Sequence, residues 1–72
     1  MAMTKVEAEV TGKVWKVVAA PGDALAAEDA IVIIESMKME IPVMAPRAGK
    51  LLRVLVKEGD QVGEGQIVAE ME

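Results

Sequence analysis

Lys38 lies in the sextet Glu35-Ser36-Met37-Lys38-Met39-Glu40, where the residue types and spacing indicate chemistry. The composition excludes most other kinds of reactive site, because the 72 residues contain no histidine and no cysteine. The usual general base at neutral pH, the commonest metal ligand and thiolate chemistry are therefore missing. A lysine between two methionines on a turn is a long, flexible amine that another enzyme can acylate. We expect a modification site at Lys38, with no catalytic residues and no metal site.

The charge of the chain excludes several classes of partner. A net charge of −4 argues against binding to nucleic acid or to anionic membranes. Trp15 is the only aromatic residue, so a platform for stacking bases is not available. No apolar run approaches the roughly 18 residues of a membrane span, and the N-terminus lacks a charged-then-apolar leader. We expect a cytoplasmic protein that is monomeric as an isolated domain.

The two halves of the chain repeat each other at an offset of 37 residues. Aligned without a gap, residues 6–35 and 43–72 share eight identities, among them the dipeptides Gly22-Asp23 and Gly59-Asp60. Average composition would give roughly two identities by chance. We interpret the chain as a single domain, residues 1–72, built from half-repeats of about 6–35 and 43–72.

Short segments rich in branched apolar residues, separated by turn signals, predict a small all-β sandwich or barrel. A further short segment is limited by Pro42 and Pro46. Residues 23–28 favour a helix but are too few to form one, and residues 60–65 are rich in glycine, so we expect loops at both places. The expected strands cover residues 14–19, 30–34, 51–56 and 66–71.

The sequence also predicts the burial or backbone conformation of single residues. Alternation counted back from Val17 places Trp15 inward, whereas a bulge near Gly12 would bring Val14 inward instead. We therefore expect Trp15 to be partly buried. Gly22 and Gly59 are expected to adopt positive φ angles in turns.

The repeat also predicts where Lys38 lies. Residues 36–42 join the two halves, whereas the free ends of the halves are the chain termini. A twofold relation between the halves puts the joint at one end of the domain and both termini at the other. Lys38 is then expected at the pole farthest from the termini.

The sextet around Lys38 resembles the attachment motif of biotinyl domains, whose core is Met-Lys-Met with the central lysine biotinylated. The similarity runs from about Val6 to Glu72 and includes the Gly-Asp turns of both halves. The resemblance implies a flattened barrel, or barrel-sandwich hybrid, of two four-stranded antiparallel sheets, with Lys38 on the hairpin between the fourth and fifth strands. The short spacing from Gly22 to Ala30 implies that the thumb of some bacterial carriers is absent.

The same resemblance implies a biotin carboxyl carrier, either a subunit or a domain of a biotin-dependent carboxylase such as acetyl-CoA carboxylase. Biotin, attached covalently to Lys38, carries an activated carboxyl group between the active sites of biotin carboxylase and carboxyltransferase. A biotin protein ligase attaches it, and the carrier is not itself a catalyst. Met37 and Met39 flank the attachment site, and Glu35, Ser36 and Glu40 take part in recognition by the ligase or partners.

Other interpretations stay open at this point. A lipoyl carrier shares the fold, and Ser36 fits either cofactor, although Met37 and Met39 favour biotin. An unmodified β-barrel interaction module would use Lys38 as an ordinary surface lysine. The two methionines could also fill gaps in the core, and Glu35 and Glu40 could be plain solvated charges. Carboxylate pairs for acid–base chemistry are not expected, because so small a barrel should have no cleft.

Overall fold

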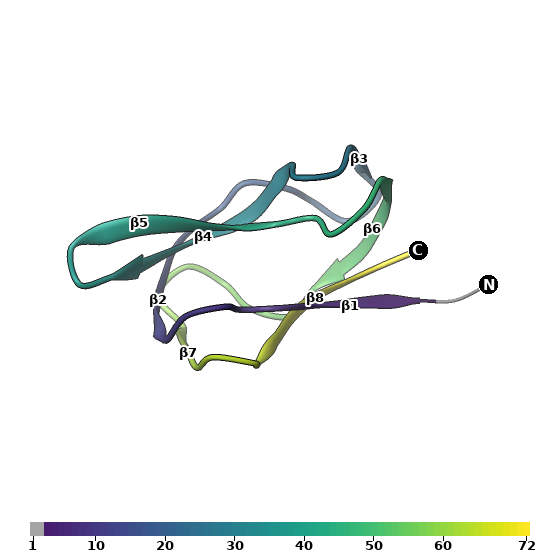
Figure 1. The fold of residues 1–72 in the computed structure, drawn as a ribbon. Coiled ribbons are helices and arrows are strands. Elements are labelled where there is room, and N and C mark those ends of the chain that lie inside the picture. The colour runs from purple at the N-terminus through teal and green to yellow at the C-terminus, as the bar shows by residue number, and fades with distance from the viewer. Residues whose placement is uncertain (1–2) are drawn as a thin grey trace.

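The computed structural model describes residues 3–72 and shows two stacked sheets (Figure 1). One sheet has the order β1-β8-β6-β3 and the other β5-β4-β2-β7, and all pairs are antiparallel. Among these residues there is no helix, and hence none that could cross a membrane. The predicted sandwich of two four-stranded antiparallel sheets is confirmed. The strands are β1 (Thr4–Glu7), β2 (Gly12–Val17), β3 (Ala24–Leu25), β4 (Ala30–Ser36), β5 (Met39–Met44), β6 (Gly49–Val54), β7 (Gln61–Val62) and β8 (Ile67–Met71).

A single apolar core fills the space between the sheets, and no polar side chain of the described residues is buried in it. Strands β4 and β8 contribute most, with three core residues each. Removal of these side chains from water is the main force that holds the sheets together. The core residues are Val6, Ala8, Val14, Ala19, Leu25, Ile31, Val32, Ile34, Val43, Ala45, Leu51, Val62, Val68, Ala69 and Met71.

Two Gly-Asp turns tie each half of the chain to the other half. Gly22 and Gly59 have φ angles of 97° and 92°, which confirms the predicted positive φ. The Gly22 amide donates to the Leu51 carbonyl, and the Gly59 amide donates to the Val14 carbonyl, both at 2.8 Å. The donors Gly22 and Gly59, and likewise the acceptors Val14 and Leu51, are related by the 37-residue offset. The same hydrogen bond between the halves therefore occurs twice, as the proposed duplication implies.

Two short strands occur where the sequence predicts loops. Strand β3 lies within residues 23–28 and β7 within residues 60–65. Each is two residues long, and β3 pairs with the start of β6 just as β7 pairs with the start of β2. A two-residue strand carries no alternating pattern, which is why the local sequence does not show it.

Trp15 is exposed, with 48% of its surface accessible, and the expected partial burial is wrong. The register between β2 and β4 shifts between Val14 and Lys16, so Trp15 is the extra residue of a bulge. The bulge changes the alternation, so Val14 points inward with 2% exposure and Trp15 points to solvent. The bulge lies at Trp15 itself, closer to the middle of the strand than the predicted position near Gly12.

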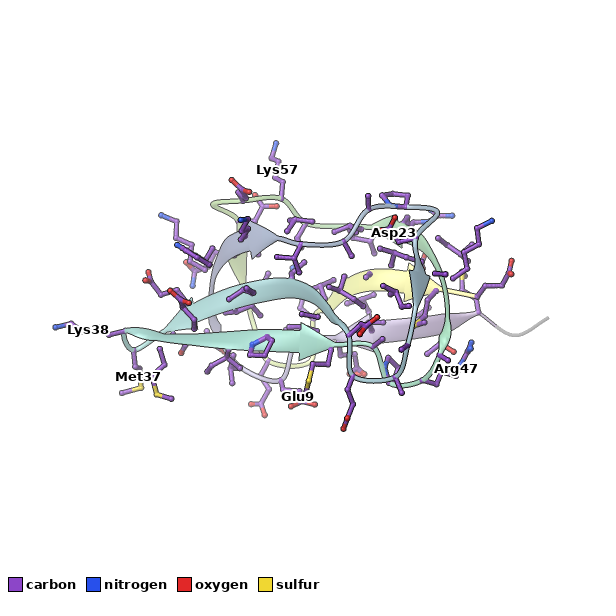
Figure 2. The ribbon with its side chains drawn as sticks, turned by 90° about the horizontal axis from the view of Figure 1, so that it is seen from above. Glu9, Asp23, Met37, Lys38, Arg47 and Lys57 are labelled. Atoms are coloured by element: carbon purple, nitrogen blue, oxygen red, sulfur yellow. The ribbon has the colours of Figure 1, made fainter. Side chains whose placement is uncertain are left out.

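The hairpin of β4 and β5 forms one end of an elongated molecule (Figure 1). The domain measures 36 × 18 × 17 Å. Thr4 pairs with Met71, which places the start of β1 beside the end of β8 at the opposite end. Figure 2 shows Lys38 and Arg47 at the two ends of the molecule. Lys38 therefore lies at the pole opposite the terminal strands, as the sequence predicts.

Candidate functional site

The tip of the β4–β5 hairpin is a two-residue turn made of Met37 and Lys38. Ser36 pairs with Met39 on the last rung of the hairpin. The φ angles of Met37 and Lys38 are 52° and 65°, the double positive φ that a type I′ hairpin turn requires. Such turns favour asparagine and glycine, because the left-handed conformation costs other residues about 1–2 kcal/mol each. The tip thus holds two residues that turn propensity alone would not place there.

Lys38 is exposed and forms no ion pair with any of residues 3–72. Its side chain projects beyond the end of the hairpin (Figure 2). Glu35 and Glu40 face each other across the strands one rung below the Ser36–Met39 pair, and both are exposed. Like charges placed directly opposite each other destabilise a hairpin. The lysine amine is therefore accessible and has two acidic side chains near it along the strands.

Met37 and Met39 both lie outside the core. Their exposed fractions are 91% and 62%. The alternative that these methionines fill gaps in the core is therefore wrong. Exposed methionines gain little from burial in this domain, and they leave a flexible apolar surface on both sides of Lys38 that a partner could contact.

Ser36 and Thr11 join the base of the hairpin to the start of β2. The Ser36 hydroxyl donates to the Thr11 carbonyl oxygen at 2.9 Å. A Cβ atom on Gly12 would lie 2.4 Å from the Glu35 carbonyl oxygen, so only glycine lets β2 approach the hairpin this closely. Sequence reasoning did not identify Thr11, and it considered Gly12 only as the place of a possible bulge. The recurrence of Gly-Lys at residues 12–13 and 49–50 is the signal that could have indicated close packing at this position.

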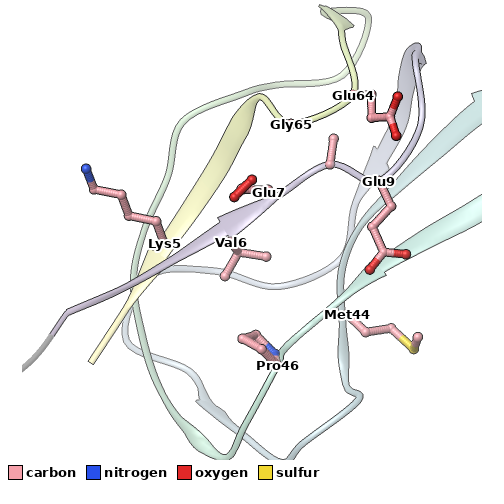
Figure 3. Close-up of a pocket in the computed structure, with 9 residues that line it drawn as sticks. Lys5, Val6, Glu7, Glu9, Met44, Pro46, Glu64 and Gly65 are labelled. Atoms are coloured by element: carbon pink, nitrogen blue, oxygen red, sulfur yellow. The ribbon is translucent and has the colours of Figure 1, made fainter.

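An open depression of 460 Å³ lies between the edges of β1 and β5 (Figure 3), although no cleft was expected. Glu7, Glu9 and Glu64 are among its lining residues. No group of acidic residues within residues 3–72 is arranged to hold a metal ion. Met44, which lines the depression, is at the far end of β5 from the turn, about 17 Å along the strand at 3.3–3.4 Å per residue. The depression therefore lies apart from Lys38.

Comparison with known proteins identifies relatives that match almost the whole chain. A biotin/lipoyl attachment protein from Bacillus subtilis is 42% identical over 92% of this chain and 90% of its own length. A protein from Mycobacterium leprae described as a biotinylated protein TB7.3 homolog is 44% identical, over 89% of this chain and 90% of its own length.

The fold matches part of a much larger enzyme. The crystal structure of the urea carboxylase of Kluyveromyces lactis superposes on the whole chain with a TM-score of 0.95 and 42% identity. The chain spans only 6% of that carboxylase. The sequence pattern of the family described as biotin-requiring enzyme matches residues 1–71. The chain belongs to this biotin-requiring enzyme family, in which it is a biotin-carrier domain.

Proposed function

We propose that Lys38 is the residue to which biotin is attached, and that the domain carries a carboxyl group between the active sites of a biotin carboxylase and a carboxyltransferase. The observation that supports this most is the position of Lys38. It is exposed at the tip of a strained turn, at the pole opposite the terminal strands, in a member of a biotin-requiring family. A linker attached at the terminal pole would leave this end free to enter other active sites.

The shape of the domain fits a covalently attached cofactor rather than an enclosed one. The depressions of 460, 530 and 260 Å³ are lined by residues outside the turn. A cofactor at the tip would therefore depend on its bond to the lysine nitrogen and would remain open to partner proteins. Attached biotin would supply the group that accepts and releases a carboxyl unit. The domain supplies reach and a high local concentration, as tethered carriers do, and we propose that it is not a catalyst.

Attachment needs a second protein. An amine and a free carboxylic acid do not form an amide unaided, so a biotin protein ligase must supply an activated acyl group and accept the proton that the lysine nitrogen loses. The amide bond removes one positive charge, and the set Glu35, Lys38 and Glu40 changes from a formal charge of −1 to −2. We propose that the ligase contacts the exposed Met37 and Met39.

Lipoyl attachment is the second candidate, because the name of the Bacillus subtilis relative covers both cofactors. Acetyl-CoA carboxylase was given as one example of a parent enzyme, and the structural relative is a urea carboxylase. Cytoplasmic location, the monomeric state and recognition by Glu35, Ser36 and Glu40 stay predictions.

Coexpression with a biotin ligase tests the proposal. We expect the wild-type chain to gain the mass of one biotinyl group and to bind streptavidin, whereas Lys38→Arg, which keeps the charge, gains nothing. Parallel coexpression with a lipoate ligase tests the second candidate. A wild-type chain that is labelled by the lipoate ligase and ignored by the biotin ligase would reverse the assignment.

A further inference from the structure

Ser36 connects the hairpin to two segments that are distant in sequence. Its hydroxyl donates to the carbonyl of Thr11, 25 residues away. The hydroxyl of Thr11 in turn accepts a hydrogen bond of 3.2 Å from the Glu64 amide. The base of the hairpin is thus joined to the β1–β2 connection and to the turn between β7 and β8. We propose that Ser36 is a positioning residue, which fixes the direction in which the hairpin presents Lys38; this inference rests on the proposed function.

At the terminal pole the equivalent carbonyl has a different donor. Ala48 stands 37 residues after Thr11, and its carbonyl accepts a 3.0 Å bond from Arg47 Nη1, from the neighbouring residue. Arg47 also donates to the Thr4 hydroxyl at 3.0 and 2.8 Å. The carbonyl accepts a side-chain hydrogen bond in both halves, from Ser36 of β4 at the Lys38 pole and from the adjacent Arg47 at the terminal pole.

The hydrogen bond from Ser36 to Thr11 opposes fraying of the strained turn. Ser36 and Met39 form the last rung, and β5 is an edge strand whose outer side pairs with no strand of residues 3–72. Opening of this rung would release the positive φ angles of Met37 and Lys38, so the strain favours fraying. The bond to Thr11 holds the Ser36 side of the rung. The hairpin then stays ordered up to the residue before the turn.

Replacing Ser36 by alanine removes this bond without disrupting the fold, because Thr11 is exposed and water can hydrate its carbonyl. The net contribution of a typical hydrogen bond corresponds to roughly a twofold to tenfold change in an equilibrium. If the ligase binds only the ordered hairpin, its apparent affinity falls in proportion to the ordered fraction, and the full factor is the upper limit of the loss. For Ser36→Ala we expect the KM of the ligase for the domain to rise by up to that factor, with kcat within about twofold of wild type. Ser36→Thr keeps a hydroxyl and should restore the KM.

The experiment combines kinetics of biotinylation with ¹⁵N relaxation of the free domain, on wild type, Ser36→Ala and Ser36→Thr. Arg47→Ala is the matched control, because it removes hydrogen bonds at the terminal pole. We expect faster motion of the Lys38 amide and a raised KM in Ser36→Ala only. The control should match wild type in both readouts.

Two results would overturn the proposal. One is a KM and a Lys38 amide relaxation in Ser36→Ala that equal those of wild type. The other is a raised KM with unchanged relaxation, which would mean that Ser36 touches the ligase directly. If the wild-type chain is not biotinylated, the proposed function fails, and relaxation alone decides the positioning role: a more mobile Lys38 amide supports it, and an unchanged one refutes it.

Discussion

Replacing Met37 by asparagine is expected to stabilise the domain. Met37 has a φ angle of 52°, and a left-handed conformation costs a residue of this kind about 1–2 kcal/mol, whereas asparagine tolerates it. Full burial of a methionine contributes about 1.5–3 kcal/mol. Because Met37 is 91% exposed, its removal sacrifices only a small part of that amount. We expect a net gain of about 0.5–1 kcal/mol in the free energy of unfolding.

Thermal unfolding followed by circular dichroism measures this gain. In a domain of this size 1 kcal/mol shifts Tm by about 4–8 °C, so Tm should rise by roughly 2–8 °C. Met39→Asn is the control, because Met39 is also exposed and has no positive φ. The control should show no gain, since asparagine is disfavoured in strands. A Met37→Asn protein that melts at or below the wild-type temperature would refute the argument that the turn is strained.

Four further substitutions test other parts of the structure. Glu28 has a φ angle of 74°, and Gly65, its equivalent in the repeat, has one of 85°. Glu28→Gly should therefore raise the free energy of unfolding in urea by about 1 kcal/mol, and Gly65→Ala should lower it by a similar amount. Gly12→Ala should lower the free energy of unfolding by about 1–3 kcal/mol, because its Cβ would clash with the Glu35 carbonyl oxygen. A variant as stable as the wild type would show that β2 and β4 can move apart at no cost. Met39→Ala should change the free energy of unfolding by less than about 1 kcal/mol. The same substitution should weaken the binding free energy of the ligase by a larger amount. A loss of about 2 kcal/mol or more would make Met39 a core residue.

The architecture was predictable where the sequence repeats a pattern over several residues. The branched apolar run of β4 predicts a central strand, and the Gly-Asp turns at residues 22 and 59 predict positive φ at their glycines. The resemblance of the sextet to a known motif predicted Lys38 as the site and its place on the hairpin. The pole followed from the repeat, since two related halves must place their joint opposite their free ends.

The remaining features depend on register and long-range contacts. Trp15 was misplaced because a bulge in β2 changes the alternation at one residue, and nothing local distinguishes that residue from its neighbours. Glu28 adopts the same left-handed conformation as Gly65 in the other half, and a glutamate does not signal a positive φ angle. The bond from Ser36 to Thr11 spans 25 residues and exists only once the sheets are formed.

Tandem mass spectrometry of the domain after coexpression with biotin ligase tests the central claim most directly, because it locates the modified residue. The account predicts that all of the biotin is found on Lys38 and none on the other lysines of the chain. Biotin on another lysine, or an unmodified Lys38 in the presence of an active ligase, would contradict it.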